Sequence, residues 1–181
     1  MTKKLVCFDF DDTLFHTPGP EEGKNIWQQA TGKEWPYIGW WGKHETLNTE
    51  IFEIPINEWV KEKYFEHIVD PLTKVIVATG RLNKVKGMRE NINKIFEKNE
   101  LKFHEVHLNW GGDTLDFKKK LFGQKLDEHE YDEFIMFDDR QEHLPQFENW
   151  AELESINRNI NITIVDVINK TEKTFKPFQI K

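Results

Sequence analysis

Two acidic residues, Asp9 and Asp11, follow the apolar run Leu5 to Phe8 near the start of the chain. Successive side chains of a β-strand point to opposite faces, so a strand that reaches Phe10 would place both carboxylates on one face at its tip. The tight turn after them frees backbone N–H groups, which attract anions. One carboxylate could then attack a phosphorus atom while the other moves a proton. The pair therefore predicts chemistry on phosphate groups.

The rest of the chain alternates between apolar strands and amphipathic helices, which predicts the scaffold that such a pair needs. We expect strands near residues 4–10, 75–78, 106–108, 133–137 and 162–165, and helices near residues 56–68, 85–96, 116–126 and 144–153. This succession predicts an α/β fold, a Rossmann-like parallel sheet flanked by helices. One domain is expected over residues 1–181, with residues 16–55 as a small, irregular, cap-like insertion after the first strand.

Polar residues follow three of the predicted strands, and a lysine near the start of a helix accompanies them. The segments are Asp9 to Asp11, Thr79-Gly80-Arg81 and Asp138-Asp139, and the lysine is Lys118. In open α/β sheets, ligands bind beyond the carboxyl ends of the strands. We therefore expect these segments to converge on one crevice, although each alone could be a turn or helix cap.

Several assignments within these segments stay open. Arg81 could clamp a substrate phosphate or pair with a surface carboxylate. Thr79 could cap a helix and bind phosphate at once. Asp138 and Asp139 cannot both face a metal from a pleated strand. One would therefore bind the metal directly, and the other would contact groups around the metal site or a loop N–H. The sequence does not tell which.

The insertion contains four aromatic residues close together, Trp35, Tyr37, Trp40 and Trp41. A small aromatic core under the cap is the favoured interpretation, because aromatic side chains dominate burial in short segments. The alternative is a platform on which Trp40 and Trp41 stack a nucleic-acid base beside the phosphate site.

Composition excludes several classes of protein. The formal net charge of −7 over 181 residues argues against a protein that coats nucleic acid without specificity. Cys7 is the only cysteine, so no disulfide framework exists and a cytoplasmic location is expected. No segment has the apolar length of a membrane span, so no membrane partner is expected. His104 and His107 lack partners at zinc spacing, and no zinc site is expected.

In their order along the chain, Asp9-x-Asp11-x-Thr13, Thr79-Gly80-Arg81, Lys118 and Asp138-Asp139 resemble the four motifs of the haloacid-dehalogenase (HAD) superfamily of phosphotransferases. The resemblance implies that Asp9 is the nucleophile that forms an aspartyl-phosphate. It implies that Asp11 protonates the leaving oxygen and then activates water, and that Thr79 and Lys118 hold the phosphoryl group. Thr13, Gly80 and Arg81 complete the expected substrate site.

The same resemblance implies a Mg²⁺ cofactor. Its ligands would be Asp9, the backbone carbonyl of Asp11, and Asp138 or Asp139. Hard oxygen ligands are those that Mg²⁺ prefers, and a phosphoryl group in transit needs its charge neutralised.

Finer details resemble the Swiss-army-knife RNA-repair branch of the superfamily. They are Thr13-Leu14-Phe15-x-Thr17-Pro18, Gly39-Trp40-Trp41, Thr114-x-x-Phe117-Lys118 and Phe137-Asp138-Asp139-Arg140-x-x-His143. The Gly112-Asp113-Thr114 and Asp-Asp-Arg runs are also similar to the phosphatase domain of phage-type polynucleotide kinases. The chain has no phosphate-binding loop of the kinase type. The expected function is thus a Mg²⁺-dependent phosphatase of nucleic-acid 3′ ends, with free nucleotides or other small phosphate esters as the alternative substrates.

Overall fold

The central strand of the sheet, β1 (Lys4–Phe8), is apolar on both faces, and this explains its position. Val6 and Phe8 pack into one hydrophobic cluster, whereas Leu5 and Cys7 pack into another on the opposite face. Such double burial is typical of a parallel strand covered by helices on both sides. In the computed structural model, which describes residues 2–177, β1 pairs in parallel with β2 (Thr73–Leu82) and β4 (Glu133–Asp138).

The outer strands complete a six-stranded sheet in the order β3-β2-β1-β4-β5-β6. Strands β3 (Glu105–Asn109) and β5 (Asn161–Asp166) are parallel to their neighbours, but β6 (Thr171–Phe175) is antiparallel to β5. The sequence did not predict β6, because four of its five residues are exposed and it therefore lacks apolar alternation. The predicted α/β fold is confirmed, with a sheet that is mostly parallel.

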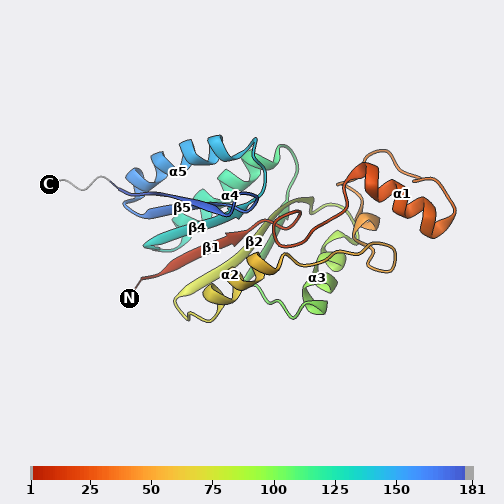
Figure 1. Ribbon diagram of the computed structural model, residues 1–181. Helices are drawn as coiled ribbons and strands as arrows, with labels where there is room; N and C mark the ends of the chain where they lie inside the picture. The colour runs from red at the N-terminus through yellow and green to blue at the C-terminus, as the bar shows by residue number, and fades with distance from the viewer. Residues whose placement is uncertain (1, 178–181) are drawn as a thin grey trace.

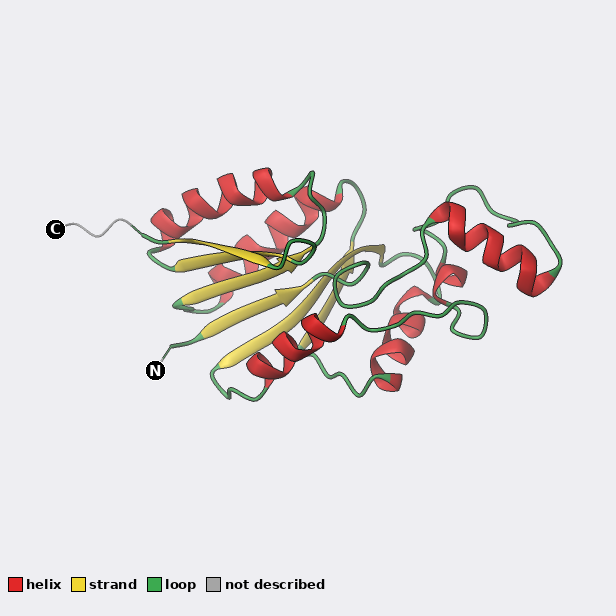
Figure 2. Ribbon diagram, viewed as in Figure 1, coloured by secondary structure: helices red, strands yellow, loops and turns green. Residues whose placement is uncertain are grey.

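Helices cover both faces of the sheet (Figures 1 and 2). α2 (Glu58–Ile68) and α3 (Met88–Lys98) pack in the cluster that holds Val6, and α4 (Thr114–Glu128) and α5 (Leu144–Arg158) pack in the cluster that holds Leu5. No helix within residues 2–177 has the length and apolar character to cross a membrane.

The insertion begins after Phe15 and ends before Ile56, and these two residues form an isolated antiparallel bridge outside the sheet. The N–H of His16 donates to Pro55 O at 2.9 Å beside this bridge. The insertion contains helix α1 (Pro20–Thr31) and the short 3₁₀ helix η1 (His44–Leu47), and α1 lies beyond the carboxyl ends of the strands (Figure 1).

The expectation of an irregular insertion is therefore wrong over α1. Pro20 in the first turn and the acidic Glu21 and Glu22 after it are helix-start signals. The helix itself has no apolar periodicity, because Gly23 is its single fully buried residue.

Trp40 forms the centre of a small aromatic core inside the insertion. Its side chain is 4 % exposed, its Nε1 donates to Pro18 O at 2.8 Å, and its ring lies 4.7 Å from Trp35 and 5.6 Å from Phe52. A Cβ atom on Gly23 would lie 2.0 Å from the Trp40 ring, so only glycine lets α1 approach this closely. The favoured interpretation of the aromatic residues as a core holds for Trp40.

Candidate active site

The turn after β1 places Asp9 and Asp11 by different means. β1 ends at Phe8, but the N–H of Asp9 still donates to Phe137 O at 3.0 Å, so Asp9 remains in line with the strand. Asp12 adopts a left-handed φ of 54°, and its N–H donates to Phe15 O at 2.7 Å. Asp11 thus belongs to a turn, and the expected alternation of a strand through Phe10 is wrong.

Asp9, Asp138 and Asp139 form an acidic cluster, with one oxygen from each carboxylate within 4.8 Å of the others. The buried ammonium of Lys118 lies in this cluster, 2.6 Å from Asp138 Oδ2 and 3.1 Å from Asp9 Oδ1. Lys118 comes from α4, where its side chain is on the buried face next to Phe117. The site therefore draws on β1, α4 and β4, as the strand-end argument predicts.

Burial and charge shift the pKa values of these groups. Burial raises the pKa of Asp9 well above its usual range, and Asp138 and Asp139 add to this effect, while Lys118 opposes it. Burial and the neighbouring Asp138 raise the pKa of Asp139 to about 6. Burial alone would lower the pKa of Lys118. The negative charges of Asp138 and Asp9 together outweigh this effect and raise the pKa above its usual range.

Three carboxylates around one ammonium leave an excess of negative charge in a region of low dielectric. Hard oxygen donors at this spacing suit a divalent cation, and the cluster could hold one. Thr13 extends the cluster, because its hydroxyl donates to Asp139 Oδ1 at 3.1 Å.

Arg81 pairs with Asp11 through two nitrogens. Its Nε lies 2.9 Å from Asp11 Oδ2, and its Nη2 lies 2.7 Å from Asp11 Oδ1. Arg81 is 2 % exposed, and its Nη1 donates to Trp41 O and to Thr46 Oγ1 inside the protein. Of the two interpretations of Arg81, the structure shows a carboxylate pair, but an internal one rather than one at the surface.

Thr79 and Gly80 lie inside β2, which continues to Leu82 with a register shift after Thr79. Thr79 Oγ1 accepts the N–H of Arg81 at 3.1 Å. The interpretation of Thr79 as a helix cap is wrong, because α3 begins at Met88 after Gly87. A Cβ atom on Gly80 would lie 2.8 Å from Thr114 Oγ1, so glycine here lets the start of α4 approach β2.

Trp41 lies at the opening of the site. Its side chain is 39 % exposed, and its ring centroid is 5.1 Å from the guanidinium carbon of Arg81. It lines a hollow of about 460 Å³ together with residues of the β1 turn, the β4 end and the loop after β5: Asp11, Asp12, Asp139, Arg140, Gln141, Glu142 and Ile168. Trp41 and Trp40 thus differ, since Trp40 is enclosed in the aromatic core.

Sequence reasoning missed two threonines that contact this network. Thr17 donates its hydroxyl to Asp11 Oδ1 at 2.8 Å, and Thr46 accepts from Arg81 at 2.6 Å. Thr17 belongs to the Thr13-Leu14-Phe15-x-Thr17-Pro18 motif, which could have indicated a role for its hydroxyl. Thr46 is separated from Arg81 by 35 residues, and no local pattern marks such a contact.

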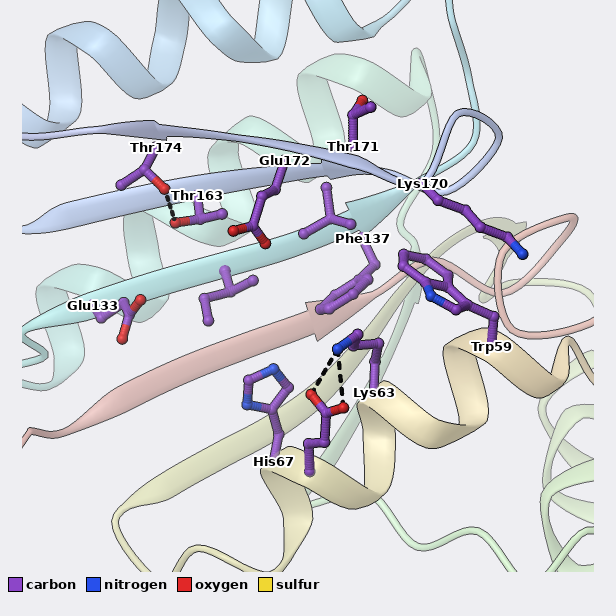
Figure 3. Close-up of a pocket in the computed structure, with 13 residues that line it drawn as sticks. Trp59, Lys63, His67, Glu133, Phe137, Thr163, Lys170, Thr171, Glu172 and Thr174 are labelled. Atoms are coloured by element: carbon purple, nitrogen blue, oxygen red, sulfur yellow. Dashed lines mark hydrogen bonds and ion pairs between the residues drawn. The ribbon is translucent and has the colours of Figure 1, made fainter.

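A second hollow, of about 310 Å³, is lined by none of the residues of the acidic cluster. Figure 3 shows this hollow in close-up. Trp59, Lys63 and His67 of α2 line one side of it. The apolar floor includes Phe137, and the far side includes Glu172 of β6. None of the residues predicted to form the phosphate site lines this hollow.

Comparison with solved structures supports the fold. Two structures of a Pnkp1/Rnl/Hen1 RNA repair complex each contain a chain that matches 81% of this chain with a TM-score of 0.54 and 17% identity. This chain covers 39% and 42% of those chains, or about two fifths of their length. A HAD-superfamily hydrolase, subfamily IA, variant 1, from Geobacter sulfurreducens matches 91% of this chain, and 86% of its own length is covered, with a TM-score of 0.50 and 11% identity. At such identities the likeness concerns the fold alone.

Comparison with sequences identifies the family. No curated protein matches the chain. The family described as HAD domain family 1 in Swiss Army Knife RNA repair proteins matches residues 20–177, a range that begins after the Asp9 to Thr13 motif. The chain belongs to this HAD family of Swiss Army Knife RNA repair proteins.

Proposed function

We propose that this chain removes phosphate from nucleic-acid 3′ ends in a Mg²⁺-dependent reaction that passes through an aspartyl-phosphate on Asp9. The observation that carries the proposal is the buried ammonium of Lys118 between Asp9 and Asp138, at the carboxyl ends of β1 and β4. A nucleophilic carboxylate, a fixed positive charge and spare acidic ligands in one place suit phosphoryl transfer, which depends on positioning and charge neutralisation.

In the first step, a carboxylate oxygen of Asp9 attacks the phosphorus atom, and the bond from phosphorus to the ester oxygen breaks. Asp11 gives a proton to the departing oxygen. Lys118 offsets the charge of the phosphoryl oxygens, and Thr79 donates its hydroxyl to one of them. Thr79 Oγ1 accepts a hydrogen bond from the N–H of Arg81, so the hydrogen of its hydroxyl is available to a phosphoryl oxygen.

In the second step, water attacks the phosphorus atom of the aspartyl-phosphate, and the bond between phosphorus and the Asp9 oxygen breaks. Asp11 takes the proton of this water, so the catalytic cycle returns Asp9 and Asp11 to their starting states. Inorganic phosphate leaves through the opening beside Trp41.

The cation would be held by Asp9, the Asp11 carbonyl and a carboxylate of the Asp138-Asp139 pair, and it would neutralise phosphate charge. We favour Asp139 as the direct ligand. Both oxygens of Asp138 have partners inside the protein, since Oδ2 accepts from Lys118 and Oδ1 accepts the N–H of Arg140 at 3.0 Å. Asp139 lines the opening instead.

A nucleic-acid end is supported as the substrate by the family, whose members belong to RNA repair proteins, and by the likeness in fold to a chain of an RNA repair complex. The exposed ring of Trp41 offers a face on which a terminal base could stack. The net charge of −7 instead favours a small phosphate ester, which needs no extended basic surface.

Phosphate release separates these substrates. The assay compares 3′-phosphorylated and 5′-phosphorylated oligonucleotides of RNA and DNA with free nucleotides and sugar phosphates, with and without Mg²⁺. We expect the highest kcat/KM for a 3′-phosphorylated oligonucleotide, with a steep decline as salt rises. We also expect loss of turnover in EDTA, restored by added Mg²⁺.

Asp9→Asn is the control for chemistry at this site, and it should abolish release from every substrate. A preference for free nucleotides or sugar phosphates would contradict the nucleic-acid proposal while retaining the phosphatase. Full activity in EDTA would contradict the metal.

A further inference from the structure

Arg81 connects the insertion to Asp11. One side of its guanidinium pairs with the Asp11 carboxylate, and Nη1 on the other side donates to Trp41 O at 3.0 Å and to Thr46 Oγ1 at 2.6 Å. Both of the latter acceptors belong to the insertion. We propose that Thr46 is a positioning residue that holds Arg81 and, through it, the proton-transferring carboxylate of Asp11. The inference rests on the proposed function, in which Asp11 is the acid and base.

The contacts of Asp11 leave one oxygen suited to proton transfer. Oδ1 accepts from Arg81 Nη2 at 2.7 Å, from Thr17 Oγ1 at 2.8 Å and, at the longer distance of 3.2 Å, from Arg81 Nε, so its two lone pairs are occupied. Oδ2 accepts from Arg81 Nε at 2.9 Å and keeps a lone pair. A rotation of the guanidinium would therefore change which Asp11 oxygen is available and where it points.

The hydroxyl of Thr46 is itself fixed in orientation. It donates its single hydrogen to Lys43 O at 2.7 Å, so it faces Arg81 as an acceptor. Thr46 is 1 % exposed. Water therefore does not readily replace its hydroxyl, and the loss of this acceptor would leave a buried guanidinium N–H with one partner fewer.

The short helix that carries Thr46 is attached to the body of the fold. Asn91 of α3 donates to His44 O at 2.9 Å, and Leu47 is buried in the cluster that contains β1. The insertion thus presents a fixed acceptor to Arg81 rather than a loose loop. This arrangement makes the position of Asp11 depend on residues of the insertion, although Asp11 follows β1.

Leaving groups of different basicity test this inference. An alkoxide needs a proton as it departs, whereas p-nitrophenolate leaves readily without one, so a displaced general acid slows hydrolysis of an alkyl phosphate selectively. The value of kcat/KM reports the steps up to leaving-group departure. A general structural defect would lower kcat/KM for both kinds of ester.

The experiment measures kcat/KM for β-glycerophosphate and p-nitrophenyl phosphate in Thr46→Val, which removes the hydroxyl and keeps the shape. We expect about a tenfold loss with β-glycerophosphate and less than about a threefold loss with p-nitrophenyl phosphate, as displacement of a catalytic group costs more when its proton is needed. Thr46→Ser should restore the ratio. Should Thr46→Val fail to fold, Thr46→Ala removes the same hydroxyl and should show the same selectivity.

Thr31→Val is the matched control in the insertion, because the Thr31 hydroxyl bonds only to nearby backbone groups of residues 27 and 33: it donates to their carbonyl oxygens and accepts the N–H of Lys33. It should change neither rate. Equal losses on both esters, or no loss, in Thr46→Val and Thr46→Ala would overturn the inference.

Two further variants separate this inference from the proposed function. Turnover by Asp9→Asn would contradict the proposed function itself. Equal slowing of both esters by Asp11→Asn would overturn the role of Asp11 as acid, and the role of Thr46 with it.

Discussion

The carboxyl edge of the sheet and the insertion both contribute to the site, but they do so through different kinds of contact. At the sheet edge, parallel register places Asp9 beside Asp138, because Phe8 pairs with Phe137 one residue earlier in each strand. In the insertion, Thr46 and Trp41 reach Arg81 through contacts between residues 35 and 40 positions apart in the chain. In the proposed reaction the edge supplies the reacting groups, and the insertion holds one of them in place and contributes Trp41 to the opening.

We expect substitutions at the sheet edge to have the largest effects on stability and turnover, and Lys118→Met tests this. The substitution leaves the carboxylates of Asp9 and Asp138 buried without their cation. Loss of one partner from a buried ion pair costs about 3–5 kcal/mol, so we expect a large fall in the free energy of unfolding. Phosphatase turnover should fall by at least about a hundredfold, because an electrostatic contact to the phosphoryl group is lost.

Urea unfolding and phosphate release measure the two effects of Lys118→Met. Lys119→Met is the matched control, because Lys119 lies one residue later and forms a half-exposed pair with Asp116 at 3.6 Å. It should alter stability by less than about 0.5 kcal/mol. Similar behaviour of the two variants would show that the Lys118 pair does not hold the site together.

Glycine substitutions compare the packing of the insertion with that of the sheet layer. Gly23→Ala would place a Cβ 2.0 Å from the Trp40 ring, so it should destabilise the protein by about 1–3 kcal/mol through overpacking. Gly123→Ala in α4 meets its nearest atom at 4.0 Å and should stabilise by about 0.5–1 kcal/mol through helix propensity. Thermal unfolding of both variants checks the opposite signs, and stabilisation by Gly23→Ala would contradict the close packing of α1 on Trp40.

Trp41 tests whether the insertion contributes to substrate choice as well as support. Trp41→Ala should raise KM for a 3′-phosphorylated oligonucleotide about tenfold, since stacking of a base on an aromatic ring is worth about 1–3 kcal/mol. KM for β-glycerophosphate should stay within about twofold, because it has no base, and Trp41→Phe should retain much of the oligonucleotide affinity. Equal effects on both substrates would argue against stacking.

The last comparison concerns the pH dependence of Glu105 at the start of the edge strand β3. Partial burial would raise the pKa of Glu105, but contacts with Lys74, His107 and Lys125 lower it to about 2. The folded pKa is below the ordinary value of 4.5, so this group stabilises the protein above pH 4.5 and loses its contribution as the pH falls towards 2.

After allowance for solvent screening, the contribution of Glu105 is about 1 kcal/mol. The measurement is the difference in unfolding free energy between the protein and Glu105→Gln at a series of pH values. This difference should shrink between pH 4.5 and pH 2. A constant difference over that range would contradict the low pKa.

The sequence predicted the sheet edge well because its determinants are local. An apolar run marks each buried strand, and the polar residues after it reach the same edge whenever the strands are parallel. Lys118 was predicted through the resemblance of Thr114-x-x-Phe117-Lys118 to a family motif, and both Phe117 and Lys118 are buried residues of α4. The turn that positions Asp11 was not predicted, because it depends on the left-handed backbone of Asp12.

The insertion and the final strand were predicted less well because their determinants are tertiary. Helix α1 buries a glycine against Trp40, and a missing side chain leaves no apolar pattern. β6 is mostly exposed, so its pairing with β5 decides its structure. The burial of Arg81 depends on Thr46 and Trp41, which lie far from it in sequence.

The most direct test of the account is to identify the residue that receives the phosphoryl group. The reaction with a 3′-phosphorylated oligonucleotide is quenched in acid within one turnover and reduced with borohydride, which converts an aspartyl-phosphate to homoserine, and the peptides are analysed by mass spectrometry. We predict homoserine at position 9 and none in protein incubated without substrate. Rapid phosphate release with an unmodified Asp9, or with the modification at another residue, would contradict phosphoryl transfer to Asp9.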